Sequence, residues 1–318
     1  MKLLLFNDGR PGLLRGSGVV DITDAVRPVT TARGQEAMQA IIANFDKLQS
    51  ELIRLQRNGK TVPLASVKLQ SPLPRPGKIL AMGGNFSEFG HRPPAPMWGF
   101  VKSPDAVIGP GGVCVLPSID ANIFHHEPEL VLVFGRAGKD IKAANAFDYV
   151  FGYTCGVDVS ARMPAPAGAG GGGGPRRDAL PLSEHKSHKT FAPLGPWIVT
   201  KDEVPDPEKL QVRLWDNGEL RGNYNTSDIN HSIAASIEFA TAMESVSPGD
   251  VFYLGTNHQG LGAMQDGDAI EIEIDKVGRM SFNVSDPLKR RWQRGVDELT
   301  AEDVRNGAGG PGRRQRPL

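Results

Sequence analysis

One stretch, His125 to Gly135, constrains most strongly what this chain can fold into. Its sequence, His-His-Glu-Pro-Glu-Leu-Val-Leu-Val-Phe-Gly, is rich in aliphatic and β-branched residues and ends at a glycine, which predicts a β-strand. Because side chains alternate along a strand, Glu127 and Glu129 point the same way, and Val131 and Val133 continue that face. Two neighbouring carboxylates on a largely apolar face repel each other and are costly to desolvate. A bound divalent cation would remove that cost, whereas a polar strand end in water would explain a lone Glu-x-Glu pair.

Length and composition exclude several classes of protein. The 318 residues are enough for a sizeable core and for two unequal domains. The 36 Lys and Arg residues balance 36 Asp and Glu residues, which argues against nucleic acid or an anionic membrane as the main partner. Two cysteines, Cys114 and Cys155, cannot form a disulfide framework and fit a reducing cytosol. The apolar start of the chain is too short for a signal peptide or a transmembrane helix, so we expect a cytoplasmic protein.

The pattern along the chain predicts three parts. Residues 1–72 form a small N-terminal α+β domain, with a helix over residues 35–56 where apolar side chains recur every three or four positions. Residues 73–288 hold many short strands and few helices, including a hairpin at Asn217-Gly218. Residues 289–318 form a charged tail that we expect to be partly disordered. This pattern favours a β-dominated α+β fold over a doubly wound sheet.

Two glycine-rich stretches invite a nucleotide-binding interpretation that their context does not support. Gly83-Gly84 permits a tight turn, but the spacing of a dinucleotide fingerprint is missing. The run Gly168–Gly174 lacks the Gly-Lys-Ser/Thr ending and the flanking strand of a phosphate loop. We therefore expect a flexible surface loop there.

A series of short motifs resembles the fumarylacetoacetate hydrolase (FAH) family over residues 78–284, in the family's order. The motifs are Gly83-Gly84-Asn85-Phe86, Phe100-Val101-Lys102-Ser103-Pro104, Glu127-Pro128-Glu129, Gly152-Tyr153-Thr154, Asp158-Val159-Ser160-Ala161-Arg162, Lys186-Ser187, Phe191-Ala192-Pro193-Leu194-Gly195-Pro196, Asn225-Thr226-Ser227-Asp228 and Gly255-Thr256. Each is weak alone, but the ordered set is specific. The resemblance implies a mixed β-roll around a divalent metal, usually in a homodimer, and chemistry on 2-oxo or β-diketo acids.

The resemblance also implies a metal site. In the family, the Glu-x-Glu pair and the Asp of the Asp-Val-Ser-Ala-Arg motif bind magnesium or manganese, and these positions fall on Glu127, Glu129 and Asp158. Carboxylate oxygens suit such a hard cation better than they suit zinc. The family's lysine, which holds or polarises the substrate carbonyl or enolate, falls on Lys186, although Lys189 lies close by and an ordinary exposed lysine is the alternative.

The family resemblance further implies substrate contacts at Arg162, Thr256 and Tyr153. Of these, Thr256 matches the family's Gly-Thr turn.

The chain departs from the family at the group that activates water. Family hydrolases carry a His followed three residues later by a Glu on a short lid helix, and the aligned positions here are Phe89 and Arg92. Glu88 and His91 are the nearest candidates for a replacement base in the sequence, and His258 follows the substrate-contacting turn. These candidates, and the absence of any base, stay open.

We therefore expect a Mg²⁺- or Mn²⁺-dependent hydrolase that cleaves a C–C bond in a small, acylpyruvate-like β-diketo or 2-oxo acid. One alternative is a family member that uses no activated water: a 2-oxo acid decarboxylase, dehydratase or tautomerase. Another is a non-catalytic binding protein on the same fold. The missing lid histidine favours both alternatives, whereas the intact carboxylates and Lys186 argue against the binding protein. The expected partners are a small carboxylate substrate and a second copy of the chain.

Overall fold

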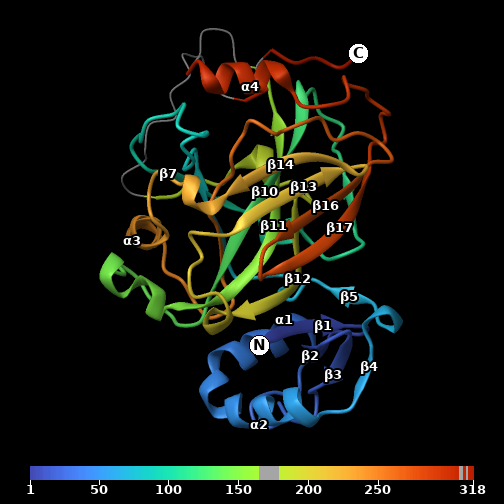
Figure 1. Ribbon diagram of the computed structural model, residues 1–318, viewed down its shortest axis with the longest axis vertical. Coiled ribbons are helices and arrows are strands. Elements are labelled where there is room, and N and C mark those ends of the chain that lie inside the picture. The colour runs from blue at the N-terminus through green and yellow to red at the C-terminus, as the bar shows by residue number, and fades with distance from the viewer. Residues whose placement is uncertain (165–178, 308–310, 313) are drawn as a thin grey trace.

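The computed structural model describes residues 1–164, 179–307, 311–312 and 314–318, and the expected glycine-rich surface loop lies outside them. Strands dominate the described residues and assemble into two sheets, which confirms the strand-rich α+β fold class (Figure 1). The chain starts in a small unit at one end of the molecule, and helix α4 (Glu298–Arg305) lies at the opposite end.

The larger sheet has twelve strands among the described residues. Their bounds are β1 (Lys2–Phe6), β2 (Arg10–Arg15), β3 (Gly18–Asp21), β4 (Thr61–Pro63), β5 (Leu69–Gln70), β6 (Ile79–Gly83), β7 (Trp98–Lys102), β8 (Val107–Ile108), β10 (Ile123–Phe134), β11 (Val150–Arg162), β12 (Ala192–Thr200) and β15 (Val251–Tyr253). The main path runs β4-β3-β2-β1-β12-β11-β10-β15-β6-β7, while β5 pairs with β1 and β8 with β12. Because β1 pairs with β12, backbone hydrogen bonds join the N-terminal strands to the rest of the sheet. The division at residues 72 and 288 stays a prediction.

The smaller sheet has five strands among the described residues, in the order β14-β13-β16-β17-β9. Their bounds are β9 (Val113–Val115), β13 (Gln211–Asp216), β14 (Glu219–Asn225), β16 (Ala269–Ile274) and β17 (Gly278–Ser285). Asn217 and Gly218 have φ angles of 52° and 81°, so they form the tight hairpin turn expected between β13 and β14. The Tyr224 hydroxyl donates to the Pro128 carbonyl over 2.5 Å, which ties this sheet to β10.

The other α-helices are α1 (Gly34–Ala43), α2 (Phe45–Asn58) and α3 (Ile233–Met243). The single helix expected over residues 35–56 is divided at Asn44, whose φ of −120° is not helical. The apolar periodicity continues across the break because both helices pack their apolar faces onto the N-terminal strands.

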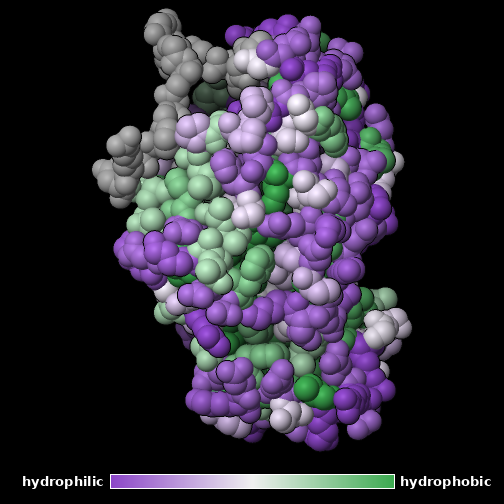
Figure 2. All heavy atoms as spheres, turned by 60° about the vertical axis from the view of Figure 1, so that its left-hand side comes forward, coloured by the Kyte–Doolittle hydropathy of each residue, from purple (hydrophilic) through white to green (hydrophobic). Residues whose placement is uncertain are grey.

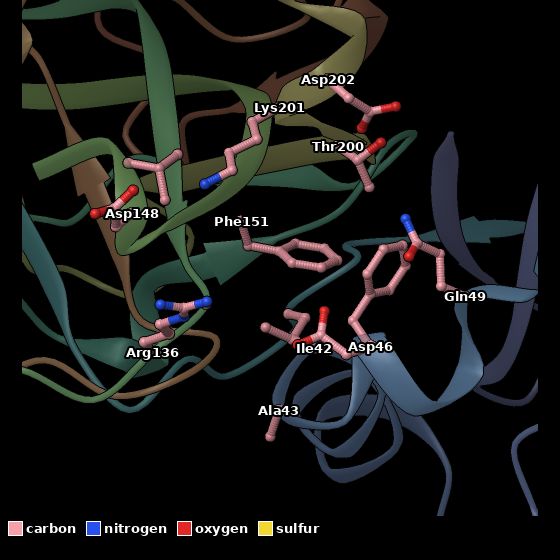
Figure 3. A pocket seen from close by; sticks show the side chains of 13 residues that line it. Ile42, Ala43, Asp46, Gln49, Arg136, Asp148, Phe151, Thr200, Lys201 and Asp202 are labelled. Carbon is pink, nitrogen blue, oxygen red and sulfur yellow. The ribbon is translucent and has the colours of Figure 1, made fainter. Parts of the chain in front are cut away.

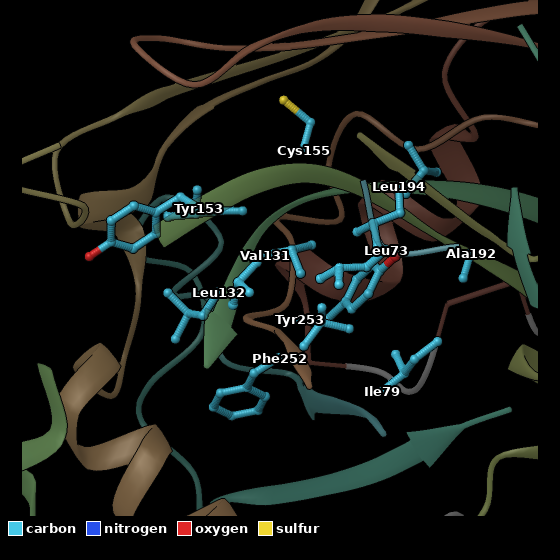
Figure 4. Packing of buried hydrophobic residues seen from close by; sticks show 14 of the residues in the cluster. Leu73, Ile79, Val131, Leu132, Tyr153, Cys155, Ala192, Leu194, Phe252 and Tyr253 are labelled. Carbon is cyan, nitrogen blue, oxygen red and sulfur yellow. The ribbon is translucent and has the colours of Figure 1, made fainter. Parts of the chain in front are cut away.

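Strands β10 and β11 form the buried centre of the molecule, and all twelve residues of β10 are buried. Their antiparallel register places Glu127 directly opposite Asp158. The apolar side chains of Val131 and Leu132 on β10 pack with Tyr253 of the neighbouring β15 in the main hydrophobic core (Figure 4). The expected strand is therefore observed, and its polar first half is buried as deeply as its apolar second half.

Gly152 lets β12 approach β11 closely. A Cβ at this position would lie 2.2 Å from the backbone oxygen of Val199, so an alanine would force β12 to move. We expect Gly152→Ala to lower the free energy of unfolding by about 1–3 kcal/mol, the usual cost of overpacking. Chemical denaturation would measure this, with Ser281→Thr, which adds a methyl group at an exposed strand position, as the control. Equal stabilities of the two variants would contradict this account of the Gly-Tyr-Thr motif.

A pocket of about 340 Å³ lies between α1, α2 and the ends of β11 and β12 (Figure 3). Phe151 lies on its wall, at the end of β11 away from Asp158. Its charged lining mixes both signs, with Asp46 and Asp148 beside Arg136 and Lys201. This pocket therefore has no bias towards an anionic ligand and is separate from the buried acidic residues.

The surface carries some exposed apolar side chains, among them Phe89, Trp98 and Leu182. Figure 2 shows hydrophobic residues gathered in the middle of one face and flanked by hydrophilic ones. The homodimer stays a prediction. Among the described residues, no helix combines the length and the apolar character that a membrane span requires.

Candidate metal centre and active site

Three buried carboxylates meet at the centre of the larger sheet. One oxygen from each of Glu127, Glu129 and Asp158 lies within 4.8 Å of the others, and we call these residues the acidic triad. Strand alternation puts both glutamates on one face of β10, and the β10–β11 register brings Asp158 to the same face. The side chains expected as metal ligands are therefore together, although their role as ligands stays a proposal.

Three cations surround the triad. The Lys186 ammonium donates to Glu127 Oε2 over 2.8 Å and to Asp158 Oδ2 over 2.5 Å. Arg162 donates to Glu127 Oε1, and the buried Lys102 donates to Asp158 Oδ1. The described part of the site therefore balances three carboxylates with three cations.

The two glutamates of the triad differ in their acidity. Burial favours the neutral form of Glu127, but the charges of Lys186 and Arg162 hold its pKa well below the ordinary value. The charge of a protonated His258 acts in the same direction. Burial raises the pKa of Glu129 well above the ordinary value, and the negative charges of the other two carboxylates add to this. Among the described residues, the ion pairs of the triad involve Glu127 and Asp158, and none involves Glu129.

A turn that follows β15 closes the site on the side of Glu129. The backbone N–H of Gly255 donates to Glu129 Oε2 over 2.5 Å. Gly255 has a φ of 92°, a left-handed conformation that glycine adopts without strain. The next residue, Thr256, is buried and lies next to Tyr224, and its role as a substrate contact stays a proposal.

The same turn holds a histidine–glutamate pair. His258 Nδ1 lies 2.5 Å from Glu88 Oε1, and the backbone N–H of His258 donates to Glu88 Oε2 over 2.8 Å. Glu88 is fully buried, and His258 is 8% exposed. We call these two residues the dyad. It has the composition of the family's lid pair but comes from different sequence positions.

Asp228 connects the two loops that carry the dyad. Its carboxylate accepts hydrogen bonds from the backbone N–H of Phe89 over 3.2 Å and from the side chain of Asn257 over 2.8 Å. Glu88 and Phe89 have φ angles of 56° and 57°, an uncommon conformation for side chains of this size. Asp228 therefore stabilises a strained turn that directs Glu88 at His258.

Two residues expected at the site are not brought to it. His91 is exposed, and its backbone N–H donates to the Glu88 carbonyl in the turn. Tyr153 pairs with Leu132, so it lies on the face of β11 opposite Asp158 and packs into the core (Figure 4). We therefore do not retain Tyr153 as a substrate contact or His91 as the base.

Lys102 is the main site residue that the sequence analysis missed. It lies within the Phe-Val-Lys motif that marked the resemblance, and its ammonium is fully enclosed between Asp158 and the Phe191 carbonyl, 2.8 Å away. Burial lowers its pKa, although Asp158 opposes the shift. A lysine that ends an apolar strand was the signal, because a buried ammonium requires an anionic partner.

The site fits a hard divalent cation. The ligand atoms are carboxylate oxygens, which Mg²⁺ and Mn²⁺ prefer. The Lys186 ammonium bridges Glu127 and Asp158, so these two carboxylates already attract a cation. Among the described residues Glu129 pairs with no cation, so its carboxylate is available to a metal ion.

Comparisons with known proteins agree with this geometry. The family described as fumarylacetoacetate (FAA) hydrolase C-terminal matches residues 79–285. Maleylpyruvate hydrolase of Aquipseudomonas alcaligenes is 30% identical over 303 residues, which cover 89% of this chain and 99% of that protein. The mitochondrial oxaloacetate tautomerase of Xenopus laevis is also 30% identical, over 84% of this chain and 82% of its own length.

Solved structures give the same result. The maleylpyruvate hydrolase of Sphingobium sp. SYK-6, in complex with manganese(II) and pyruvate, is 32% identical and has a TM-score of 0.77 over 90% of this chain and 99% of its own. A 2-hydroxyhepta-2,4-diene-1,7-dioate isomerase of Mycobacterium marinum is 33% identical, with a TM-score of 0.60 over 72% of this chain and 82% of its own. The chain therefore belongs to the fumarylacetoacetate hydrolase family.

Proposed function

We propose that this enzyme is a Mg²⁺- or Mn²⁺-dependent hydrolase that cleaves a C–C bond in an acylpyruvate-like β-diketo acid. In the balanced reaction, water adds to the distal carbonyl carbon, the bond from that carbon to the methylene breaks, and the products are a carboxylic acid and pyruvate. The dyad is the observation that carries this proposal, because hydrolysis needs a group that takes a proton from water.

The acidic triad would hold the cation at the 2-oxo acid end of the substrate. A bound divalent ion supplies Lewis acidity that withdraws electron density from the 2-oxo group. The Lys186 ammonium pairs with carboxylate oxygens of Glu127 and Asp158. A metal ion bound by these two residues would leave the ammonium free for the substrate enolate or carboxylate. Arg162, at 14% side-chain exposure, is a second group for a substrate carboxylate.

The dyad would activate water at the opposite end of the substrate. If Nδ1 of His258 donates its proton to Glu88, Nε2 is left as the atom that can accept a proton from water. Glu88 then fixes the tautomer and stabilises the imidazolium that forms, as the carboxylate of a catalytic triad does. A decarboxylase or tautomerase of this family would need no water activated at this position.

The relatives support the same substrate class without choosing between reactions. Two similar proteins are named maleylpyruvate hydrolases, one of them solved with pyruvate, whereas another is named an oxaloacetate tautomerase. The buried dyad favours hydrolysis.

A product assay tests the proposal. We expect acylpyruvates, including maleylpyruvate, to be converted to pyruvate and a second acid with Mn²⁺ or Mg²⁺ present, and the rate to vanish with excess chelator. Oxaloacetate should be the poorer substrate. Metal-dependent enol–keto interconversion of oxaloacetate, without C–C cleavage of any acylpyruvate, would replace hydrolysis by tautomerisation.

A further inference from the structure

We infer that the C-terminal segment positions the metal centre through a chain of hydrogen bonds from Asp297 to Glu127. Asp297 lies beyond residue 285, where the match to the family model ends. The inference rests on the proposed metal site and adds a positioning residue to it.

His125 stands in the middle of this chain of contacts, two residues before Glu127 on β10. His125 is fully buried, and its Nε2 lies 3.0 Å from Asp297 Oδ2. On the other side of the ring, Arg162 Nε donates to His125 Nδ1 over 3.2 Å. The same guanidinium donates to Glu127 Oε1, so one arginine joins the histidine to the acidic triad.

The partners of His125 determine its tautomer. An arginine can only donate hydrogen bonds, so Nδ1 must be the acceptor and Nε2 must carry the proton that it donates to Asp297. Asp297 therefore holds His125 in the form that can accept from Arg162. Without Asp297, the ring could rotate or change tautomer, and Arg162 would lose the contact that orients its fork towards Glu127.

Asp297 is itself held firmly. Its carboxylate accepts from the backbone N–H of Thr300 over 3.0 Å, from the Thr300 hydroxyl over 2.6 Å and from Gln315. Its own backbone N–H donates to the carbonyl of Leu261, just after the turn that carries the dyad. The Asp–Thr contacts cap the N-terminus of α4, so the helix fixes the start of the hydrogen-bond chain.

Gly312 gives independent support from packing. A Cβ at this position would lie 2.5 Å from Cγ and 2.7 Å from Cβ of Arg162, so the backbone of the segment lies directly against the arginine side chain. The N–H of Gly312 donates to the Thr300 hydroxyl over 2.8 Å, which links this packing to Asp297. The segment therefore constrains Arg162 both by contact and through His125.

Titration of the full chain with Mn²⁺ in a calorimeter, without substrate, tests the inference. Asp297→Ala should weaken Mn²⁺ binding by about 10- to 100-fold, the usual effect of losing a partner that orients a metal ligand. His125→Phe should weaken it similarly, and the double variant should be no worse than either single variant, because both act through one chain of contacts. The matched control is Asp303→Ala, which also removes a carboxylate of α4 but one that binds Arg314 instead of His125.

Mn²⁺ affinity in Asp297→Ala within twofold of that in Asp303→Ala would overturn the inference, and so would additive losses in the double variant. If Asp297→Ala does not fold, Gly312→Ala carries the test, since it removes no side-chain hydrogen bond but places a Cβ against Arg162. Wild-type affinity in that variant would equally overturn the inference. Glu129→Gln separates the two proposals. If the wild type binds Mn²⁺ and Glu129→Gln does not, the metal site stands whatever Asp297 does.

Discussion

Replacing His258 with alanine is expected to lower kcat by about 10²- to 10⁴-fold in the metal-dependent cleavage of an acylpyruvate, with a much smaller change in KM. The loss follows from the position of the imidazole, whose Nδ1 contacts the buried Glu88 and leaves Nε2 to accept a proton from water. Metal affinity should stay near that of the wild type, because His258 is not among the three carboxylates that would hold the ion. Steady-state kinetics with saturating Mn²⁺ measures both parameters.

His91→Ala is the matched control for this variant. His91 is exposed and sits in the same loop as Glu88, so its removal should leave kcat near the wild-type value. Glu88→Gln should also lower kcat strongly, because it weakens the bond that fixes the imidazole. If His258→Ala and Glu88→Gln both turn over at the wild-type rate, no water is activated by the dyad, and decarboxylation or tautomerisation becomes the better description.

Removing a carboxylate of the acidic triad is expected to weaken Mn²⁺ binding by more than about 100-fold, beyond the effect of losing an outer partner. Glu129→Gln is the cleanest variant, because Glu129 accepts a hydrogen bond from the backbone N–H of Gly255 and a Gln oxygen can still accept it. Asp158→Ala should in addition destabilise the fold by about 3–5 kcal/mol, since it leaves the buried ammonium of Lys102 without its anionic partner.

Calorimetry with Mn²⁺ and thermal unfolding, run on the same samples, separate these effects. Glu129→Gln should lose the metal with little change in melting temperature, whereas Asp158→Ala should lose both. Wild-type Mn²⁺ affinity in two of the three single variants at Glu127, Glu129 and Asp158 would refute the assignment of the metal site.

The centre of the fold could be predicted because its signals are local. A period of two residues places Glu127 and Glu129 on one face, and the order of motifs along the chain brings Asp158 opposite them. Side-chain alternation also places Tyr153 on the other face of β11, because it lies an odd number of positions from Asp158.

The dyad could not be predicted as a pair. Glu88 and His258 are 170 positions apart, and neither lies in a motif that predicts a contact with the other. His91 was an equal candidate because its loop is rich in proline, but the left-handed conformations at Glu88 and Phe89 turn the carboxylate inwards and leave His91 outside. Such backbone geometry depends on contacts with Asp228, which no sequence period reveals.

In the C-terminal segment, by contrast, composition suggests less structure than the described residues have. Its charge and its glycine and proline content predict disorder, yet Trp292 and Thr300 are buried and Asp297 contacts His125. In the structure, Asp297 caps α4 by accepting from the backbone N–H of Thr300, a local signal that the prediction from composition did not use.

Hydrolysis of an acylpyruvate in water enriched in heavy oxygen, with Mn²⁺ bound, tests the central claim most directly. The account predicts that one solvent oxygen enters the newly formed distal carboxylate, that pyruvate appears in equal amount, and that His258→Ala slows both together. An enzyme-free sample gives the background of carbonyl exchange. Metal-dependent consumption of the substrate with carbon dioxide release, or with all carbon atoms kept in one product and no solvent oxygen in a new carboxylate, would contradict it.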